Sequence, residues 1–164
     1  MASYINRKDL TTIMAKHGSL LFEYSQITPN IYVGTNMCCQ THFKKVLVKK
    51  GISADISLEQ ERVDKPFGVS YYCWLPTKDH TPPDRKQLLI GVQLLTSLIS
   101  HKEKAYVHCQ RGHGRAPTLV AAYLISQGKS VEDAIDLIKK KRPSIHLEKN
   151  QILALKRFGK FLKR

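Results

Sequence analysis

The segment HCQRGHGR, residues 108–115, holds a cysteine and an arginine separated by five residues. A cysteine thiolate is a strong nucleophile, and the planar guanidinium of arginine can hold two phosphate oxygens at once. Gly112 and Gly114 permit backbone angles that other residues resist, so the N–H groups of this segment can turn toward one anion. The pattern predicts a phosphate site in which Cys109 is the nucleophile and Arg115 is the clamp.

The elements on either side of this segment favour the same chemistry. AYVHC (105–109) predicts a buried strand, and APTLVAAYLISQ (116–127) predicts an apolar helix that ends at Gly128. A helix N-terminus carries unpaired N–H groups and positive potential, which stabilise a bound anion and a thiolate. A lone cysteine is more often a small buried hydrophobe. Here the strand, the glycines and the helix all agree with a catalytic role.

Strand and helix patterns alternate along the rest of the chain. A strand or hairpin is predicted at 27–34, strands at 52–58 and 69–75, and a charged loop at 59–68. Helices are predicted at 5–17 and at 42–51, the second closed by Gly51. Thr81-Pro82-Pro83-Asp84 predicts a helix start with the prolines at the first helical positions. The last two helices are predicted from the cap Ser130 to Arg142-Pro143, and around Ile152, Leu155, Phe158 and Leu162. Such alternation predicts an α/β fold with a central, mostly parallel sheet of four to five strands flanked by helices on both faces. We expect one domain, 1–164, in which 1–26 form an N-terminal extension packed on it.

The chain is strongly basic, with a formal net charge of +14. Residues 139–164 contain ten Lys or Arg and one acid. This charge predicts either a solvated face or attraction to anionic partners, namely a phosphorylated protein, an inositol lipid or RNA.

Hydropathy and cysteine usage predict the compartment. No apolar run approaches the roughly 18 residues of a membrane span. The N-terminal residues show no apolar segment followed by a small-residue cleavage site, so we expect no secretory signal. Cys38, Cys39, Cys73 and Cys109 have no zinc-type spacing, so we interpret them as thiols in a reducing compartment. We expect a cytoplasmic monomer without stable membrane insertion, metal or cofactor.

Residues 107–125, VHCQRGHGRAPTLVAAYLI, resemble the signature loop and following helix of the dual-specificity phosphatases. This family belongs to the cysteine-based protein tyrosine phosphatase superfamily, and the chain resembles its compact, atypical type. ITPNIYVG, GISADISLEQE and RPSIHLEKNQILALKRF are similar to the family's opening strands, core strand and closing helices. The resemblance implies hydrolysis of phosphate monoesters on protein tyrosine, and on serine or threonine, through a phosphocysteine intermediate.

The resemblance also implies roles for residues outside the cysteine and arginine pair. Asp79, thirty residues before Cys109, matches the family's general acid, whereas the competing Asp84 suits a helix start. His108 and His80 are implied as supporting residues. The phosphate-binding set implied by the family loop is Gln110, Arg111, Gly112, His113, Gly114 and Arg115.

One position departs from the family pattern. Ala116 stands where the family usually keeps a hydroxyl that helps the thiolate leave, and Thr118 lies two residues further on. Two alternatives to a protein phosphatase therefore stay open. One is a phosphoinositide or RNA 5′-phosphate phosphatase, because Arg111, His113 and the net charge of +14 fit either substrate. Asp79-His80-Thr81-Pro82-Pro83 resembles the corresponding loop of phosphoinositide 3-phosphatases, although Gln110 and His113 stand where those lipid enzymes have lysines. The other is a catalytically weak phosphate-binding module, which only Ala116 supports.

Overall fold

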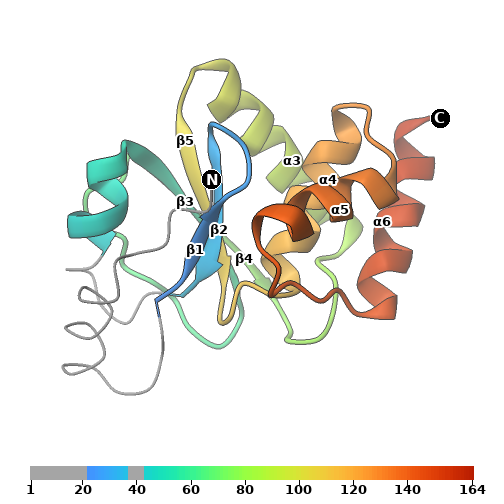
Figure 1. Ribbon diagram of the computed structural model, residues 1–164, viewed down its shortest axis with the longest axis horizontal. Helices are drawn as coiled ribbons and strands as arrows, with labels where there is room; N and C mark the ends of the chain where they lie inside the picture. The colour runs from blue at the N-terminus through green and yellow to red at the C-terminus, as the bar shows by residue number, and fades with distance from the viewer. Residues whose placement is uncertain (1–21, 37–42) are drawn as a thin grey trace.

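A computed structural model describes residues 22–36 and 43–164. Its centre is a five-stranded sheet in the order β1-β2-β5-β3-β4 (Figure 1). The strands are β1 (Tyr24–Gln26), β2 (Ile31–Thr35), β3 (Ile52–Glu59), β4 (Tyr71–Thr77) and β5 (Lys104–Cys109). The β1 strand pairs with β2 in antiparallel fashion, and every other neighbouring pair is parallel. The predicted mostly parallel sheet is confirmed.

The longer helices gather on one side of the sheet (Figure 1). They are α3 (Arg85–Ser100), α4 (Arg115–Ser126), α5 (Val131–Lys141) and α6 (Lys149–Leu162). Helix α4 lies at the centre of this layer and contacts α3, α5 and α6. Its residues from Arg115 to Leu124 are all buried, which explains why its sequence is apolar all round.

The opposite side of the sheet carries two short helical turns, η1 (Phe43–Leu47) and η2 (Val48–Lys50) (Figure 1). They replace the single helix predicted over 42–51. Gly51 ends η2 with a positive φ of 80°, as the sequence predicts. The helix predicted at 5–17 lies outside the described residues.

Side chains of β5 alternate between two apolar clusters. Ala105, Val107 and Cys109 face the core under α3 and α4, whereas Tyr106 packs with Leu47 on the other side. This alternation follows from the two-residue period of a strand. It places the last residue of β5, Cys109, on the face from which α4 departs.

The helix starts follow local capping chemistry. Asp84 is the N-cap of α3, because its backbone is extended and its carboxylate accepts from the N–H of Gln87 at 2.8 Å. The prediction that Pro82 and Pro83 occupy the first helical positions is therefore wrong. Ser130 caps α5 as predicted. Among the described residues, no helix has both the length and the hydropathy to span a bilayer.

Candidate active site

The signature loop connects the end of β5 to the start of α4. Cys109 and Arg115 are 3% and 2% exposed. Because β5 lies between the parallel strands β2 and β3, the loop sits at the carboxyl edge of the sheet, where α/β folds bind ligands. Among the described residues, no acceptor meets the backbone N–H groups of 110–114. These donors are available to an anion in the loop.

Two contacts hold the loop from behind. Gly112 has a φ of 66°, and a β-carbon there would lie 2.4 Å from the carbonyl oxygen of Gly34 in β2. The buried guanidinium of Arg142 donates from Nε to the Gly112 carbonyl at 3.0 Å and from Nη2 to the Arg111 carbonyl at 3.1 Å. Since these carbonyls are bound away from the pocket, the N–H groups of the same segment can face into it.

Arg115 is surrounded by acceptors from distant parts of the chain. Its Nη1 donates to Glu61 Oε2 and to the Thr77 carbonyl, both at 2.8 Å, and Nη2 lies 3.3 Å from Asp79 Oδ1. Nε is buried and has no hydrogen-bond partner among the described residues. Burial lowers the pKa of Arg115, but the Glu61 hydrogen bond and the nearby negative groups outweigh it, so its pKa is raised. The guanidinium is therefore a permanent cation whose Nε–H is available to a bound phosphate.

The pairing with Arg115 also changes the pKa of Glu61. Burial raises the pKa of this carboxyl, but the hydrogen bond from Arg115 and the attraction of its charge reverse the effect, so the pKa of Glu61 is lowered. The sequence of residues 59–68 predicts only a charged loop. Nothing in the local pattern marks Glu61, because its partner lies in the signature loop.

Asp79 lies on a loop that α6 holds in place. Its carboxylate is about half exposed, at 49%, and accepts from the N–H of His80 at 3.0 Å. His80 has a φ of 60°, and its Nδ1 lies 3.1 Å from Glu148 Oε1. Asn150 and Gln151, in the first turn of α6, donate to backbone carbonyls of the same loop. Asp79 therefore reaches Arg115, whereas Asp84 is occupied in capping α3.

Most of the predicted site residues meet around one pocket of about 160 Å³. Its lining includes Asp79, His80, Cys109, Gln110, Arg111, His113, Gly114 and Arg115, together with His146, Glu148 and Gln151 from the C-terminal region. Gly112 and His108 lie outside this lining. The pocket is smaller than the roughly 300–1,000 Å³ of sites that enclose drug-sized ligands. It has room for a phosphate group and the first atoms of its leaving group.

His108 lies in a buried acidic network next to Cys109. The imidazole is 0% exposed, and its Nε2 lies 3.1 Å from Asp55 Oδ1 and 3.5 Å from Asp64 Oδ2. Burial lowers the pKa of His108, but attraction and hydrogen bonding to Asp55 outweigh it, so its pKa is raised. The pairing with Asp55 therefore favours the charged form of this imidazole, one residue before Cys109 in β5.

The network also contains a group with metal-ligand composition. Glu59, Asp64 and His108 each offer a ligand atom, and these atoms lie within 4.8 Å of one another. The oxygens are already bound by protein donors, since Asn36 Nδ2 donates to both carboxylate oxygens of Glu59 and Arg62 to Asp64 at 2.6 Å. We therefore interpret the cluster as a charge-paired support for His108.

In and beside the signature loop, His113 carries no charge near pH 7 and Ala116 provides no hydroxyl. Burial, and then the charges of Arg142 and His146, lower the pKa of His113, so this side chain is neutral near pH 7. Thr118 cannot readily replace the missing hydroxyl at Ala116, because its Oγ1 donates to the Gly114 carbonyl at 2.8 Å. Ala116 is fully buried beside the loop.

Comparison with known proteins supports the interpretation of this loop. The profile of the family described as "Dual specificity phosphatase, catalytic domain" matches residues 31–161, which is most of the chain and includes the whole site. The chain belongs to the dual-specificity phosphatase family. It is thus a phosphoric monoester hydrolase by family, and its five-stranded sheet with the loop between β5 and α4 is the scaffold of that chemistry.

The relatives of this chain include one whose name carries both a lipid and a protein substrate. The human "Phosphatidylglycerophosphatase and protein-tyrosine phosphatase 1" is 42% identical over 148 residues, which cover 84% of this chain and 73% of the human protein. Mouse laforin is 26% identical over 82% of this chain, but the match spans only 48% of laforin. The crystal structure of PTPMT1 matches with a TM-score of 0.77 at 27% identity, covering 86% of this chain and 96% of that one.

Proposed function

We propose that this dual-specificity phosphatase hydrolyses phosphate monoesters with Cys109 as nucleophile, Arg115 as phosphate clamp and Asp79 as general acid. The observation that carries the proposal is the convergence of these three groups. Cys109 and Arg115 begin and end one loop with free N–H groups, and Asp79 Oδ1 lies 3.3 Å from Arg115 Nη2. A phosphate bound on the guanidinium would have the acid on one side and the sulfur on the other.

In the first step, the Cys109 thiolate attacks phosphorus in line and forms the P–S bond. The P–O bond to the leaving group breaks, and the leaving oxygen takes the proton of the Asp79 carboxyl. The loop N–H groups and Arg115 bind the three equatorial oxygens, where negative charge is spread in the transition state. Nε of Arg115 supplies a buried donor that no protein acceptor uses among the described residues.

In the second step, water attacks the phosphocysteine. Asp79, now ionised, takes a proton from this water, the P–S bond breaks, and inorganic phosphate leaves with the thiolate restored. A hydroxyl donor near the sulfur would favour that departure. Ala116 has none, and Thr118 is bound to the Gly114 carbonyl, so we expect this step to be the slower one.

For the substrate class, we favour phosphotyrosine in proteins, followed by phosphoserine and phosphothreonine. The small pocket of about 160 Å³ accepts a phosphate on a side chain that reaches in from a surface. A phospholipid monoester is the second candidate. It is favoured by the name of the human relative at 42% identity and by a PTPMT1 structure in complex with PI(5)P, which matches with a TM-score of 0.76 at 25% identity.

A side-by-side panel tests the substrate class. Phosphopeptides, a phosphoinositide, phosphatidylglycerophosphate and a 5′-phosphorylated RNA are assayed by phosphate release at equal concentrations. We expect kcat/KM to be highest for a phosphotyrosine peptide. A higher kcat/KM for either lipid in vesicles would replace the protein by a phospholipid as the substrate.

Variants test the residue roles independently of the substrate. Cys109→Ser should abolish hydrolysis of a small aryl phosphate, because a serine hydroxyl stays protonated. Arg115→Lys should lose most activity, since an ammonium lacks the planar fork. Asp79→Asn should slow esters with poor leaving groups far more than activated aryl phosphates. Its matched control is Asp84→Asn, which keeps the helix cap. The opposite ranking of the two aspartates would refute the role of Asp79.

A further inference from the structure

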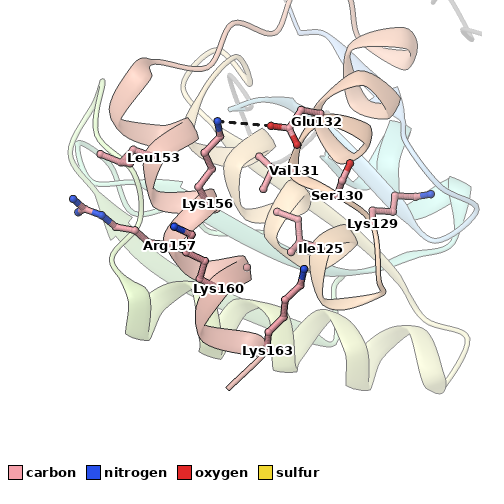
Figure 2. A pocket seen from close by; sticks show the side chains of 11 residues that line it. Ile125, Lys129, Ser130, Val131, Glu132, Leu153, Lys156, Arg157, Lys160 and Lys163 are labelled. Carbon is pink, nitrogen blue, oxygen red and sulfur yellow. Dashed lines mark ion pairs between the residues drawn. The ribbon is translucent and has the colours of Figure 1, made fainter.

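A second concave surface lies away from the catalytic pocket, where the end of α4 and the start of α5 meet α6 (Figure 2). It is a groove of about 510 Å³. Ile125, Val131 and Leu153 form its apolar part. No residue lines both this groove and the pocket around Cys109. We call it the basic groove, because five of its lining residues are Lys or Arg.

Cations dominate the edge of the basic groove. Its basic side chains are Lys129, Lys156, Arg157, Lys160 and Lys163, against one acid, Glu132. Glu132 already pairs with Lys156, whose Nζ lies 3.7 Å from Oε1 (Figure 2). Both side chains of that pair are more than half exposed, so the attraction between them is weak and Lys156 can still attract an external anion. The groove therefore keeps a strong positive field beside an apolar floor.

The spacing of the lysines along α6 matches an extended peptide. Lys156 and Lys160 lie on one face of α6, four residues apart, which corresponds to a rise of about 6 Å, and Lys163 follows as the C-cap of the helix. Alternate side chains of an extended strand lie about 6.6 Å apart. Acidic side chains at every second position of such a segment can each meet a lysine, while the intervening side chains point to the floor.

The apolar floor is recessed. Ile125 and Val131 are only partly exposed, whereas the third apolar side chain, Leu153, is 47% exposed. A concave floor of this kind fits single side chains of an extended segment better than it fits a flat bilayer. We propose that the basic groove docks an extended segment of a partner protein in which acidic and apolar residues alternate. The first turn of α6 holds the loop that carries Asp79, and the same helix lines the basic groove from Leu153 onward, so the partner would bind to the helix that supports this loop.

Direct binding tests the proposal without depending on catalysis. The probe is a short fluorescein-labelled peptide of alternating Glu and Leu, and the signal is its anisotropy. We expect binding that weakens about tenfold or more in Lys160→Glu/Lys163→Glu, because two attractive charges become repulsive. The matched control, Lys139→Glu/Lys140→Glu, makes the same charge change on exposed residues at the other end of α5 and should bind within about twofold of wild type.

Two further measurements test the contribution of the apolar floor separately from that of the lysine charges. Leu153→Ser, or a probe of alternating Glu and Ser, should also bind more weakly, while hydrolysis of a small aryl phosphate stays unchanged in every variant. The proposal is overturned if the probe does not bind, or if both double variants lose affinity equally. It is also overturned if only phosphatidylserine vesicles, and not the peptide, bind in a manner that depends on Lys160 and Lys163.

Discussion

Replacement of Arg142 by Met should both destabilise the protein and weaken phosphate binding. Arg142 is 3% exposed and contacts the signature loop only from behind. Its Nε and Nη2 donate to the carbonyls of Gly112 and Arg111. Met fills most of the same volume without a donor, so the change removes these hydrogen bonds and leaves two carbonyls without their partner.

The magnitude follows from these contacts. Hydrogen bonds to charged groups contribute about 1.5–3 kcal/mol each. The low end applies here, since burial of the guanidinium is costly enough to lower the pKa of Arg142. Two such bonds give a loss of about 3 kcal/mol in the free energy of unfolding, against a typical total of about 5–15 kcal/mol. The long contact with the partly exposed Glu23, at 3.9 Å, adds little. The melting temperature should fall by about 6–12 °C.

Urea unfolding of Arg142→Met, with the exposed neighbour Lys141→Met as control, measures this loss. The activity of the folded variant provides a second readout, because a loop with unbound carbonyls no longer directs its N–H groups at phosphate. We expect kcat/KM for an aryl phosphate to fall by about tenfold or more, and inorganic phosphate to inhibit less well. An unfolding free energy within about 1 kcal/mol of wild type, with kcat/KM unchanged, would refute the bracing role.

Three further changes have defined outcomes. Gly112→Ala should lose most of its activity toward an aryl phosphate. The added methyl group costs about 1–2 kcal/mol of backbone strain and would lie too close to the carbonyl oxygen of Gly34. Kinetics equal to those of the wild type would contradict this prediction. Ala116→Ser should shrink the burst of released phenol seen on rapid mixing, and the absence of a burst in wild type would argue against slow phosphocysteine breakdown. Asp55→Asn should lower the pKa of His108. Since the folded pKa is raised, His108 stabilises the wild type fully below about pH 6.5, and this stability is lost as pH rises through the folded pKa. Urea midpoints across pH should therefore vary less in the variant, and equal profiles would exclude the Asp55 pair as the cause.

The sequence alone was sufficient for features that depend on neighbours along the chain. The strand before Cys109, the glycine-bearing loop and the helix from Arg115 could be predicted because strand alternation, helix capping and positive φ at glycine are local effects. The same holds for Ser130 as a cap and Gly51 as a stop. Prediction was less accurate at helix starts, where Asp84 rather than the two prolines begins α3, since a cap is decided by one side-chain hydrogen bond.

Only the tertiary structure decided which distant groups complete the site. Glu61 and Asp79 reach Arg115 because β3 and β4 are parallel strands whose ends lie on the same edge of the sheet as the loop after β5. Arg142, interpreted from sequence as a helix stop, braces the loop because α5 returns the chain behind it. A hydrogen bond between residues far apart in sequence depends on strand order and helix packing. No local pattern encodes these, so such partners become visible only when the chain is folded.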